Sequence, residues 1–469
     1  MARQRPQLLR GLLVVMVCLL CAALAALGAI VAAPDAVAGL TGAPRRAWRA
    51  GTPATPPPAV LAAVGTSAPA PTAAGLAARL GPLLSDPALG GSTLAAVADA
   101  TTGERLLNRN SGAAAAPAST LKLLTAVSVL HARGATYRLT TRVVSGANPG
   151  EVVLIGGGDP TLGAGERRTY ADGARLDRLA AQVKQALGGT APTRVIIDGS
   201  LFGPAAYGPG WDDDIFSSGN AAPIASLMMD SGRVPPAGAH GTSPRTATPE
   251  VVAGRAFAAA LGVPPGAVVA GIAPAGAAQL GAVESPPMAR LVELMLVESD
   301  NVLAECLARQ VALARNQQAT FAGAAVAMRT VLGELGLPVD GLALSDGSGL
   351  SRLNRVTPAL LSEALLLAGK GARPALRPVF AGLPVGGYSG TLRDRYRSPT
   401  DGPGGAGQVR AKTGTLSGVN SIAGIVVDAD GRALVFAFIA IGGADGVPPT
   451  PPQQALDRVA AALAACGCR

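Results

Sequence analysis

Lysine is nearly absent from this chain of 469 residues. Only four of its 39 basic residues are lysines, and the other 35 are arginines. Arginine stays charged under all ordinary conditions, whereas the amine of a lysine can lose its proton when its surroundings lower the pKa. Where a charge alone is needed this sequence uses arginine, so the remaining lysines are of interest: Lys122, Lys184, Lys370 and Lys412.

Histidine and aromatic residues are also scarce, which excludes several classes of function. The two histidines, His131 and His240, have no G-x-S-x-G partner, which argues against a Ser-His-Asp hydrolase. No group of residues has metal-ligand spacing, so metal catalysis is not expected. The net charge of +9 comes from scattered arginines, with only 3% aromatic residues to stack on bases. This balance disfavours a nucleic-acid partner and favours a basic surface facing anionic lipid or wall polymer.

The five cysteines do not define a disulfide framework. Cys18 and Cys21 lie in an apolar N-terminal segment, and Cys306 lies at a helical apolar position typical of a buried side chain. Only one residue separates Cys466 from Cys468, so a bond between these two is expected to be strained. The sequence leaves the pairing of the last three cysteines open.

The first 38 residues have the features of an export segment. Three arginines precede an uncharged apolar run over residues 11–33, and residues 36–38 offer a small-x-small cleavage site. The run is longer than the core of an ordinary signal peptide and long enough to cross a bilayer. Residues 1–38 are therefore predicted to be either a cleaved signal peptide or a retained anchor that contacts the membrane. Both alternatives place the rest of the chain in the periplasmic or cell-wall space.

The remaining sequence divides into a linker, a catalytic domain and an insertion. Residues 39–75 are rich in Pro, Ala, Thr and Gly, a composition that cannot bury a core and indicates a stiff tether. Helical and strand patterns over residues 76–138 resume at 286–469, which predicts one α/β domain whose sheet is completed late in the chain. Between them, residues 139–285 show strands and Gly-rich loops, and they are predicted to form a β-rich inserted domain.

Hydrophobic periodicity gives the expected elements. Helices are predicted over residues 76–84, 119–130 and 453–465, and over 288–335 with a break near Ser299. Strands are predicted over residues 94–99, 104–109, 151–155, 194–198, 408–411, 421–427 and 433–441.

Ser119 and Lys122 form the first of three short motifs. Ser119 is predicted to lie at a helix start, where free N–H groups can hold an oxyanion, and Lys122 one turn later on the same face. A neutral lysine amine within reach of the hydroxyl can take its proton, which makes the pair a candidate nucleophile and base. Taken alone, this spacing is more often that of a capping serine followed by a solvated lysine.

Ser299, Asp300 and Asn301 form the second motif, where they interrupt a helical pattern. A second hydroxyl at a cleft can relay a proton to a leaving group, which is the role suggested for Ser299. The amide of Asn301 can hydrogen-bond a substrate amide. Taken alone, the motif is more often an ordinary helix cap or loop.

Lys412, Thr413, Gly414 and Thr415 form the third motif, which is predicted to follow a short strand. Gly414 would let a substrate approach the strand edge without a Cβ in the way. The N–H of Thr415 could complete an oxyanion hole with that of Ser119. Lys412 and Thr413 can bind a carboxylate. Taken alone, these residues fit a plain turn at a strand end.

Together the motifs read S-x-x-K, S-D-N and K-T-G, in the order found in serine enzymes that penicillin acylates. The chain resembles the serine penicillin-binding proteins, and two of its four lysines lie in these motifs. The 180 residues between Ser119 and Ser299 leave room for an inserted module. In this the chain resembles the class C, penicillin-binding-protein-4-type D-alanyl-D-alanine carboxypeptidases and endopeptidases. Other stretches similar to that family are residues 156–162, 209–213, 346–352, 383–385 and 390–392.

The resemblance implies a penicillin-binding, serine β-lactamase-like domain with an antiparallel sheet flanked by helices. It implies that Ser119 attacks the carbonyl between two D-Ala residues of a peptidoglycan stem peptide, that Lys122 accepts its proton, and that Ser299 relays a proton to the leaving amine. Water then hydrolyses the acyl-enzyme, β-lactams inhibit by the same path, and no metal or organic cofactor is required. The implied substrate-binding residues are Asn301, Lys412, Thr413, Gly414 and Thr415.

Two other functions stay open at this point. A β-lactamase shares the first steps but deacylates with a dedicated base, which the sequence does not identify, and compact lactamases lack a large insertion. A wall-binding protein of the same fold could have lost turnover, although every motif residue is intact. Compared with family members that have two full extra domains, the insertion is predicted to be shorter, with a subdomain trimmed at the Gly- and Pro-rich residues 232–250. The preference for terminal or cross-linked peptides is undetermined.

Overall fold

The computed structural model describes most of the chain from Ser67 onward. The predicted signal or anchor segment and all but the last residues of the predicted linker lie outside the described part. From residue 67 onward, the described helices include none with both the length and the apolar character needed to cross a bilayer. The described residues are 67–204, 206–234, 242–398, 402, 404–442 and 451–469.

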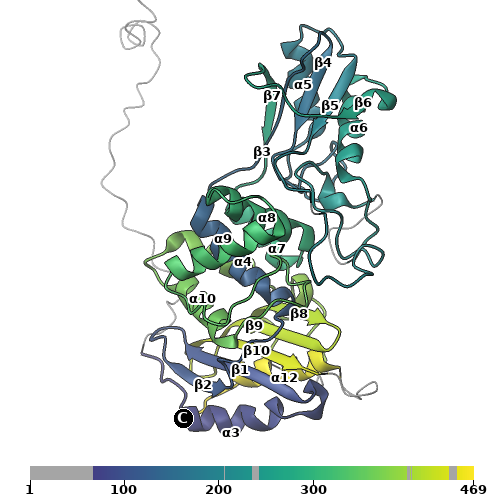
Figure 1. Ribbon diagram of the computed structural model, residues 1–469. Coiled ribbons are helices and arrows are strands. Elements are labelled where there is room, and N and C mark those ends of the chain that lie inside the picture. Colours follow the sequence, from purple (N-terminus) through teal and green to yellow (C-terminus); the bar gives the residue numbers. More distant parts are fainter. Residues whose placement is uncertain (1–66, 205, 235–241, 399–401, 403, 443–450) are drawn as a thin grey trace, which may run out of the picture. The chain divides into compact units, whose positions relative to one another are not determined.

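The first sheet has five antiparallel strands in the order β2-β1-β10-β9-β8 and lies in the lower part of Figure 1. The central strand β10 is buried on both faces, because Val435 and Ile439 face one apolar cluster and Phe436 and Phe438 face another. This double burial explains why β10 is a continuous apolar run without alternation. The strands are β1 Ser92–Asp99, β2 Arg105–Arg109, β8 Arg410–Leu416, β9 Val419–Val427 and β10 Ala433–Ile441.

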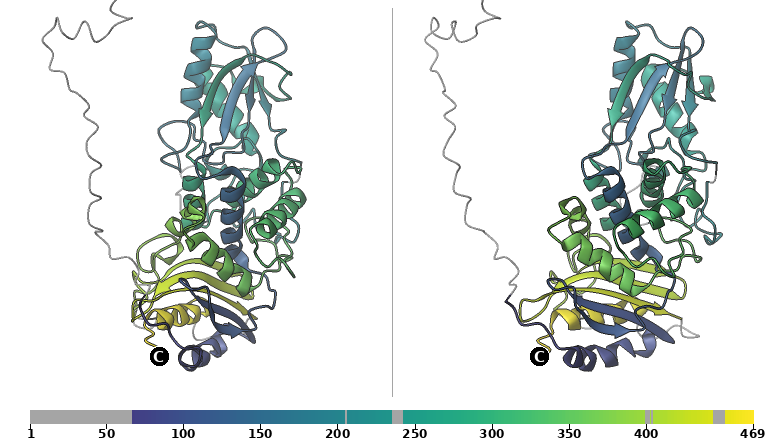
Figure 2. Two further views of the ribbon diagram at one scale, coloured as in Figure 1. Left: turned by 90° about the vertical axis from the view of Figure 1, so that its left-hand side faces the viewer. Right: turned by 60° about the vertical axis from the view of Figure 1, so that its left-hand side comes forward.

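Helices cover both faces of this sheet (Figure 2). On one face, α3 places Leu76, Leu80 and Leu84 against the sheet at a spacing of four residues, and all three are buried. Each contributes about 1.5–3 kcal/mol by its burial. The helices on this face are α3 Ala73–Leu84 and α12 Pro452–Ala464. The apolar cluster on the other face is formed with α4 Lys122–Arg133, α7 Met288–Val297, α8 Asn301–Ala314, α9 Phe321–Glu334 and α10 Pro358–Gly369.

The second sheet, in the order β6-β5-β4-β3-β7, is formed within residues 140–284. Its strands β4, β5 and β6 are parallel, and α5 and α6 connect them and pack on one face of the sheet. β3 lies antiparallel to β4 and β7. These elements are β3 Thr140–Ser145, β4 Glu151–Ile155, α5 Leu176–Ala186, β5 Arg194–Asp198, α6 Pro249–Leu261, β6 Val268–Ala270 and β7 Gln279–Glu284.

Short helices connect the longer elements. One of them, η2, carries Ser119, and η6 borders the cleft described below. They are η1 Pro87–Leu89, η2 Ala118–Leu121, η3 Asp230–Gly232, η4 Pro265–Ala267, η5 Pro374–Leu376, α11 Pro378–Ala381 and η6 Gly390–Leu392.

The elements differ from the expected ones at several places. The predicted insertion contains two helices besides its strands, and the helical stretch over 288–335 has a second break, at residues 315–320. The predicted helix over 119–130 begins as the 3-10 turn η2, and α4 starts only at Lys122. The predicted division into a 76–138 and 286–469 domain with an inserted domain stays a prediction, although all strands of the second sheet fall within 139–285.

The structure defines the cysteine pairing that the sequence left open. Cys466 and Cys468 form a disulfide, with Cα atoms 5.1 Å apart. This Cα separation lies within the usual range for a disulfide, and the expected strain of the bond stays a prediction. Cys306 is a free, buried thiol in α8, as predicted.

Candidate active site

Ser119 lies in η2, at the point where the chain enters α4. The N–H groups of a first helical turn have no partner within the helix, so the turn can hold an anion. Strand β8 lies directly against this turn, because Gly414 has no side chain. A Cβ at position 414 would come within 2.8 Å of the Ser119 nitrogen and 2.3 Å of the Ser421 hydroxyl. Gly414 therefore serves close packing of the strand against the turn that carries Ser119.

Lys122 is fully buried beneath Ser119. Its Nζ donates to Ser119 Oγ at 2.9 Å, to Asn301 Oδ1 at 2.7 Å and to the carbonyl oxygen of Ser348 at 2.7 Å. Burial lowers the pKa of Lys122 to about 8, although the charges of Asp346, Glu305 and Asp300 act in the opposite direction. The amine is therefore held within reach of the hydroxyl, with a proton that is more easily lost than in water.

Lys412 is the second buried lysine of the site. Its Nζ donates to Ser299 Oγ at 2.8 Å and to the carbonyl oxygen of Thr413 at 2.7 Å. Burial, with the charges of Lys122 and Arg395, holds the pKa of Lys412 well below its usual range. Lys412 lies inside β8, so the prediction that this motif follows the strand is wrong. The strand continues to Leu416, which pairs with Val419 across a two-residue hairpin.

The second motif sits between α7 and α8 as predicted. Ser299 has a left-handed backbone (φ 54°), which turns the chain sharply between the two helices. Asp300 caps α8 by accepting the N–H of Leu303 at 2.9 Å. Asn301 then uses both ends of its amide, since Oδ1 accepts from Lys122 and Nδ2 donates to the carbonyl oxygen of Asn220 at 3.0 Å.

Residues of the 139–285 region clamp this motif. Arg233 Nη2 donates to Asp300 Oδ2 at 2.8 Å, and the Tyr170 hydroxyl donates to the same oxygen at 2.5 Å. Both Arg233 and Asp300 are almost completely buried. Burial alone would raise the pKa of Asp300, but the charges of Arg233 and Arg245 hold it well below its ordinary value. The 139–285 region therefore fixes the position of Ser299 and Asn301 through a buried ion pair.

A buried carboxylate supports the loop that contacts Lys122. Glu305 Oε1 accepts the N–H groups of Gly347 and Ser348 at 3.0 and 2.7 Å, and Ser348 in turn gives its carbonyl oxygen to Lys122. Burial raises the pKa of Glu305 to about 7. Sequence reasoning missed Glu305, Arg233 and Tyr170. The stretch 346–352 resembles the penicillin-binding-protein-4-type family, but the contact of its Ser348 carbonyl oxygen with Lys122 was not predicted.

Five of the eight predicted site residues line one cleft of about 590 Å³. The other three, Lys122, Lys412 and Gly414, are buried beneath it. The cleft lining also carries four arginines and three acidic residues, and two of these arginines are engaged in ion pairs, Arg233 with Asp300 and Arg395 with Asp457. The predicted residues that line it are Ser119, Ser299, Asn301, Thr413 and Thr415. The arginines are Arg233, Arg245, Arg393 and Arg395, and the acidic residues are Glu298, Asp300 and Asp394.

A metal site is not apparent in the described part of the chain. No group of three or more His, Cys, Asp or Glu side chains there is arranged to hold a metal ion. His131 lies in the last turn of α4, away from the cleft lining.

The sequence is similar to carboxypeptidases along most of its length. Residues 76–243 and 235–463 match the D-Ala-D-Ala carboxypeptidase 3 (S13) family. A carboxypeptidase of Mycobacterium tuberculosis is 41% identical over 436 residues, which cover 91% of this chain and 92% of the relative. Carboxypeptidase DacB of Mycolicibacterium smegmatis is 41% identical over 89% of this chain and 90% of its own. A D-alanyl-D-alanine carboxypeptidase of an Actinomadura species is 30% identical, with coverage of 80% and 82%.

The fold is similar to that of a solved penicillin-binding protein. Penicillin binding protein 4 from Haemophilus influenzae superposes with a TM-score of 0.67 at 21% identity, over 82% of this chain and 97% of that chain. The same protein complexed with a β-lactam gives a TM-score of 0.60 at 20% identity, over 81% and 97%. The predicted fold class is therefore confirmed.

Proposed function

Because the chain belongs to the D-Ala-D-Ala carboxypeptidase 3 (S13) family, we propose that it cleaves peptidoglycan stem peptides through an acyl-enzyme on Ser119. The predicted resemblance to penicillin-binding-protein-4-type carboxypeptidases, and the predicted carboxypeptidase activity, are confirmed by the family and its relatives. The observation that best supports the proposed mechanism is the 2.9 Å contact between Lys122 Nζ and Ser119 Oγ, at a buried amine with a lowered pKa.

The proposed acylation begins when Lys122 takes the proton of Ser119 and the serine oxygen attacks the carbonyl between the two D-Ala residues. The N–H groups of Ser119 and Thr415 hold the negative oxygen that develops. The peptide C–N bond then breaks, and the leaving amine of the terminal D-Ala receives a proton relayed through Ser299. Water hydrolyses the ester, which frees Ser119.

Substrate orientation is assigned to the other motif residues. Lys412 and Thr413 bind the terminal carboxylate, whose negative charge favours the protonated form of Lys412. Thr413 is kept in place by its contact with Thr391, whose hydroxyl lies 2.8 Å away. Asn301 orients the acyl side of the peptide. A β-lactam enters the same path and forms an ester on Ser119 that deacylates slowly.

Release of free D-alanine tests this proposal. The chain should release D-alanine from a stem pentapeptide that ends in D-Ala-D-Ala, and Ser119→Ala should lower the rate by roughly 1,000-fold or more. Circular dichroism shows whether the variant is folded. A cross-linked stem-peptide dimer, assayed in parallel, measures the endopeptidase share. Unchanged turnover in Ser119→Ala would reject the acyl-enzyme on this residue, and rapid penicillin hydrolysis without D-alanine release would favour the β-lactamase alternative.

We also assign the chain to the outer side of the cytoplasmic membrane. The apolar run over residues 11–33 supports export, either as a cleaved signal or as a retained anchor, and the proposed substrate lies in the wall. The predicted tether covers residues 39–75, and because its last three residues belong to α3 we assign the tether to residues 39–72.

Catalysis should not require the N-terminal segment. A chain that begins at Ser67 keeps the carbonyl of Ala68, which accepts from Arg432, and Thr72, which caps α3 and bonds Cys468. We expect this chain to be soluble and to react with penicillin at the full-length rate, within about twofold. The measurement is the second-order acylation rate of both forms. A folded but unreactive short form would contradict the assignment of residues 1–66 as export segment and tether.

A further inference from the structure

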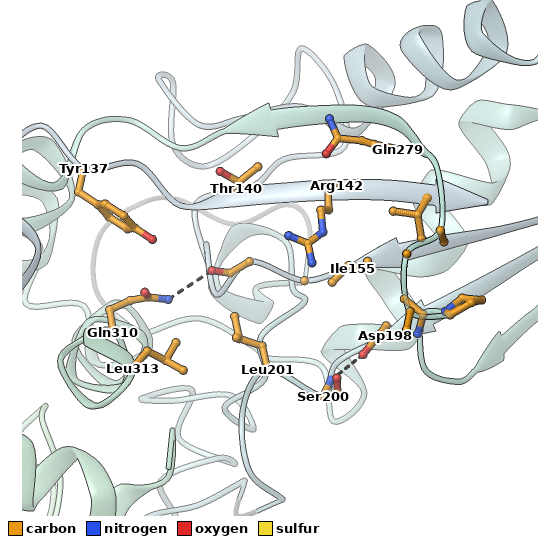
Figure 3. A pocket seen from close by; sticks show the side chains of 18 of the residues that line it. Tyr137, Thr140, Arg142, Ile155, Asp198, Ser200, Leu201, Gln279, Gln310 and Leu313 are labelled. Atoms are coloured by element: carbon orange, nitrogen blue, oxygen red, sulfur yellow. Dashed lines mark hydrogen bonds between the residues drawn. The ribbon is translucent and has the colours of Figure 1, made fainter. Parts of the chain in front are cut away.

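A second cavity, of about 920 Å³, lies apart from the cleft described above (Figure 3). It opens at the carboxyl ends of the parallel strands β4 and β5, whose last residues Ile155 and Asp198 line it. In open α/β sheets, ligands commonly bind outside the carboxyl ends of the strands. The position of this cavity is therefore that of a binding site, and Gly156 and Gly157 of the family-like stretch 156–162 are part of its lining.

One wall of the cavity is the sheet face that α5 and α6 leave uncovered. Arg142 on β3 pairs with Ile155 on β4, which pairs with Asp198 on β5, so the three side chains form one row. The neighbouring residues Val143 and Leu154 point the other way, into the core beneath the helices. Figure 3 shows the guanidinium of Arg142 extending into the cavity.

Arg142 is available to a ligand. Within the described part of the chain its guanidinium makes no hydrogen bond or ion pair, although its charge acts on the carboxylate of Asp198. Both oxygens of Asp198 are already engaged, since they accept the N–H groups of Ser200 and Ala273 at 3.0 and 2.8 Å. An exposed arginine that is directed into a cavity can bind a carboxylate.

The opposite wall is built from the far ends of the two active-site helices. Arg133 of α4 donates to the carbonyl and side-chain oxygens of Gln310 of α8 at 3.2 and 3.1 Å, and its guanidinium lies 4.7 Å from the ring centroid of Tyr137. Gln310 Nε2 donates in turn to the carbonyl oxygen of Gly157 at 3.3 Å. These hydrogen bonds fix the wall in place. The charged residues that line the cavity are then two arginines, Arg133 and Arg142, and one aspartate, Asp198.

We propose that this cavity binds a carboxylate-bearing stem peptide of the same wall polymer, separate from the peptide being cut. The Arg142 guanidinium would bind the carboxylate through bidentate hydrogen bonds, and Leu201 and Leu313 would contact the apolar side chains of the peptide. The identity of the polymer rests on the proposed function.

The geometry of the two sites favours the same polymer for both. α4 begins at Lys122 in the active site and ends at Arg133 in the cavity wall, and its 12 residues span about 18 Å. An enzyme with two such sites holds the polymer at two points. The second point should matter for peptidoglycan and not for a short free substrate.

Binding to the blocked enzyme tests the inference. The probe is a fluorescently labelled stem tripeptide without a D-Ala-D-Ala bond, titrated by anisotropy onto full-length enzyme whose active site has been acylated with penicillin. We expect saturable binding that weakens by roughly tenfold or more in Arg142→Ala and partly returns in Arg142→Lys. Arg194→Ala is the matched control, because Arg194 is an exposed arginine on the same sheet outside the cavity lining. It should bind as the wild type does.

A second measurement separates this site from catalysis. Turnover of insoluble peptidoglycan should fall several-fold in Arg142→Ala, whereas kcat/KM for a soluble pentapeptide should stay unchanged. No binding to the acylated wild type, equal binding by Arg142→Ala, or equal binding of a tripeptide with amidated carboxylates would each overturn the inference. These results leave D-alanine release untouched, so they do not bear on the proposed function.

Discussion

Replacing Lys122 by arginine will abolish acylation of Ser119. The buried Nζ of Lys122 lies 2.9 Å from the serine hydroxyl and can act as a base because burial lowers its pKa to about 8. A guanidinium keeps its proton at every accessible pH and cannot accept another. We expect the second-order rate of penicillin acylation to fall by roughly 1,000-fold or more, in line with the loss of a general base.

Lys412→Arg is the matched comparison, because Lys412 is equally buried in the same site. Its proposed task is to bind a carboxylate, and arginine keeps the required charge. The loss should therefore come from poorer fit around Ser299 and Thr413, which now accept from Lys412. We expect measurable acylation, reduced by roughly 10- to 100-fold. Equal losses in the two variants, or better survival of Lys122→Arg, would show that the proton acceptor has been assigned to the wrong amine.

The pH dependence of the wild-type rate gives a further check on Lys122. Below its pKa the amine carries a proton and cannot accept another, so the acylation rate should rise with pH and reach half of its maximum near pH 8. Residual acylation by Lys122→Arg should lack this rise. A wild-type rate that falls between pH 7 and 9 would contradict the role of Lys122 as base.

Removal of Arg233 should be the most damaging change outside the three motifs. Arg233→Met removes the ion-pair partner of Asp300 in a place where the side chains of the pair are 2% and 0% exposed, so that the buried carboxylate keeps only its hydrogen bonds and the charge of Arg245. Breaking a buried pair in this way costs about 3–5 kcal/mol of unfolding free energy. Acylation should also slow, because Asp300 lies between Ser299 and Asn301 and caps α8.

Arg290→Met is the control for this variant. Arg290, like Arg233, takes part in an ion pair between the 139–285 region and the residues that follow it, because it lies 2.9 Å from Asp172. The side chain of Arg290 is 38% exposed, however, and that of Asp172 is 54% exposed. An exposed pair is worth about 0–1 kcal/mol. Denaturant unfolding and penicillin acylation should be measured for both variants. Similar losses of stability in the two would show that the buried pair has no special role.

The sequence predicted those features of the site that depend on short-range order. Ser119 and Lys122 lie one helical turn apart, and this spacing alone places the amine beneath the hydroxyl. Alternation and apolar runs predicted β4 and β5 at their observed bounds and located β1, β2, β9 and β10 closely, but β3, β6 and β7 of the second sheet were not predicted. The position of Lys412 within β8 was missed, because its Gly- and Thr-rich sequence has the composition of a turn.

Long-range contacts were beyond the reach of sequence patterns. Arg233 is one of 35 arginines in the chain, and nothing near it indicates a partner at Asp300. Glu305 lies on a helix face that could equally be solvated, and only tertiary packing brings it to the loop behind Lys122. Arg142 lies in an ordinary strand and was not predicted either, because its interest depends on the cavity that residues of the 139–285 region form with α4 and α8.

The central claim is that Ser119 is the nucleophile, and mass spectrometry of a trapped penicillin adduct tests it most directly. Full-length protein that releases D-alanine should gain the mass of one penicillin per chain, and peptide mapping should place the adduct on Ser119 alone. Ser119 combines a helix start with a lysine at i+3 that contacts its hydroxyl. An adduct on Ser299, or an active enzyme that forms no adduct, would contradict this account.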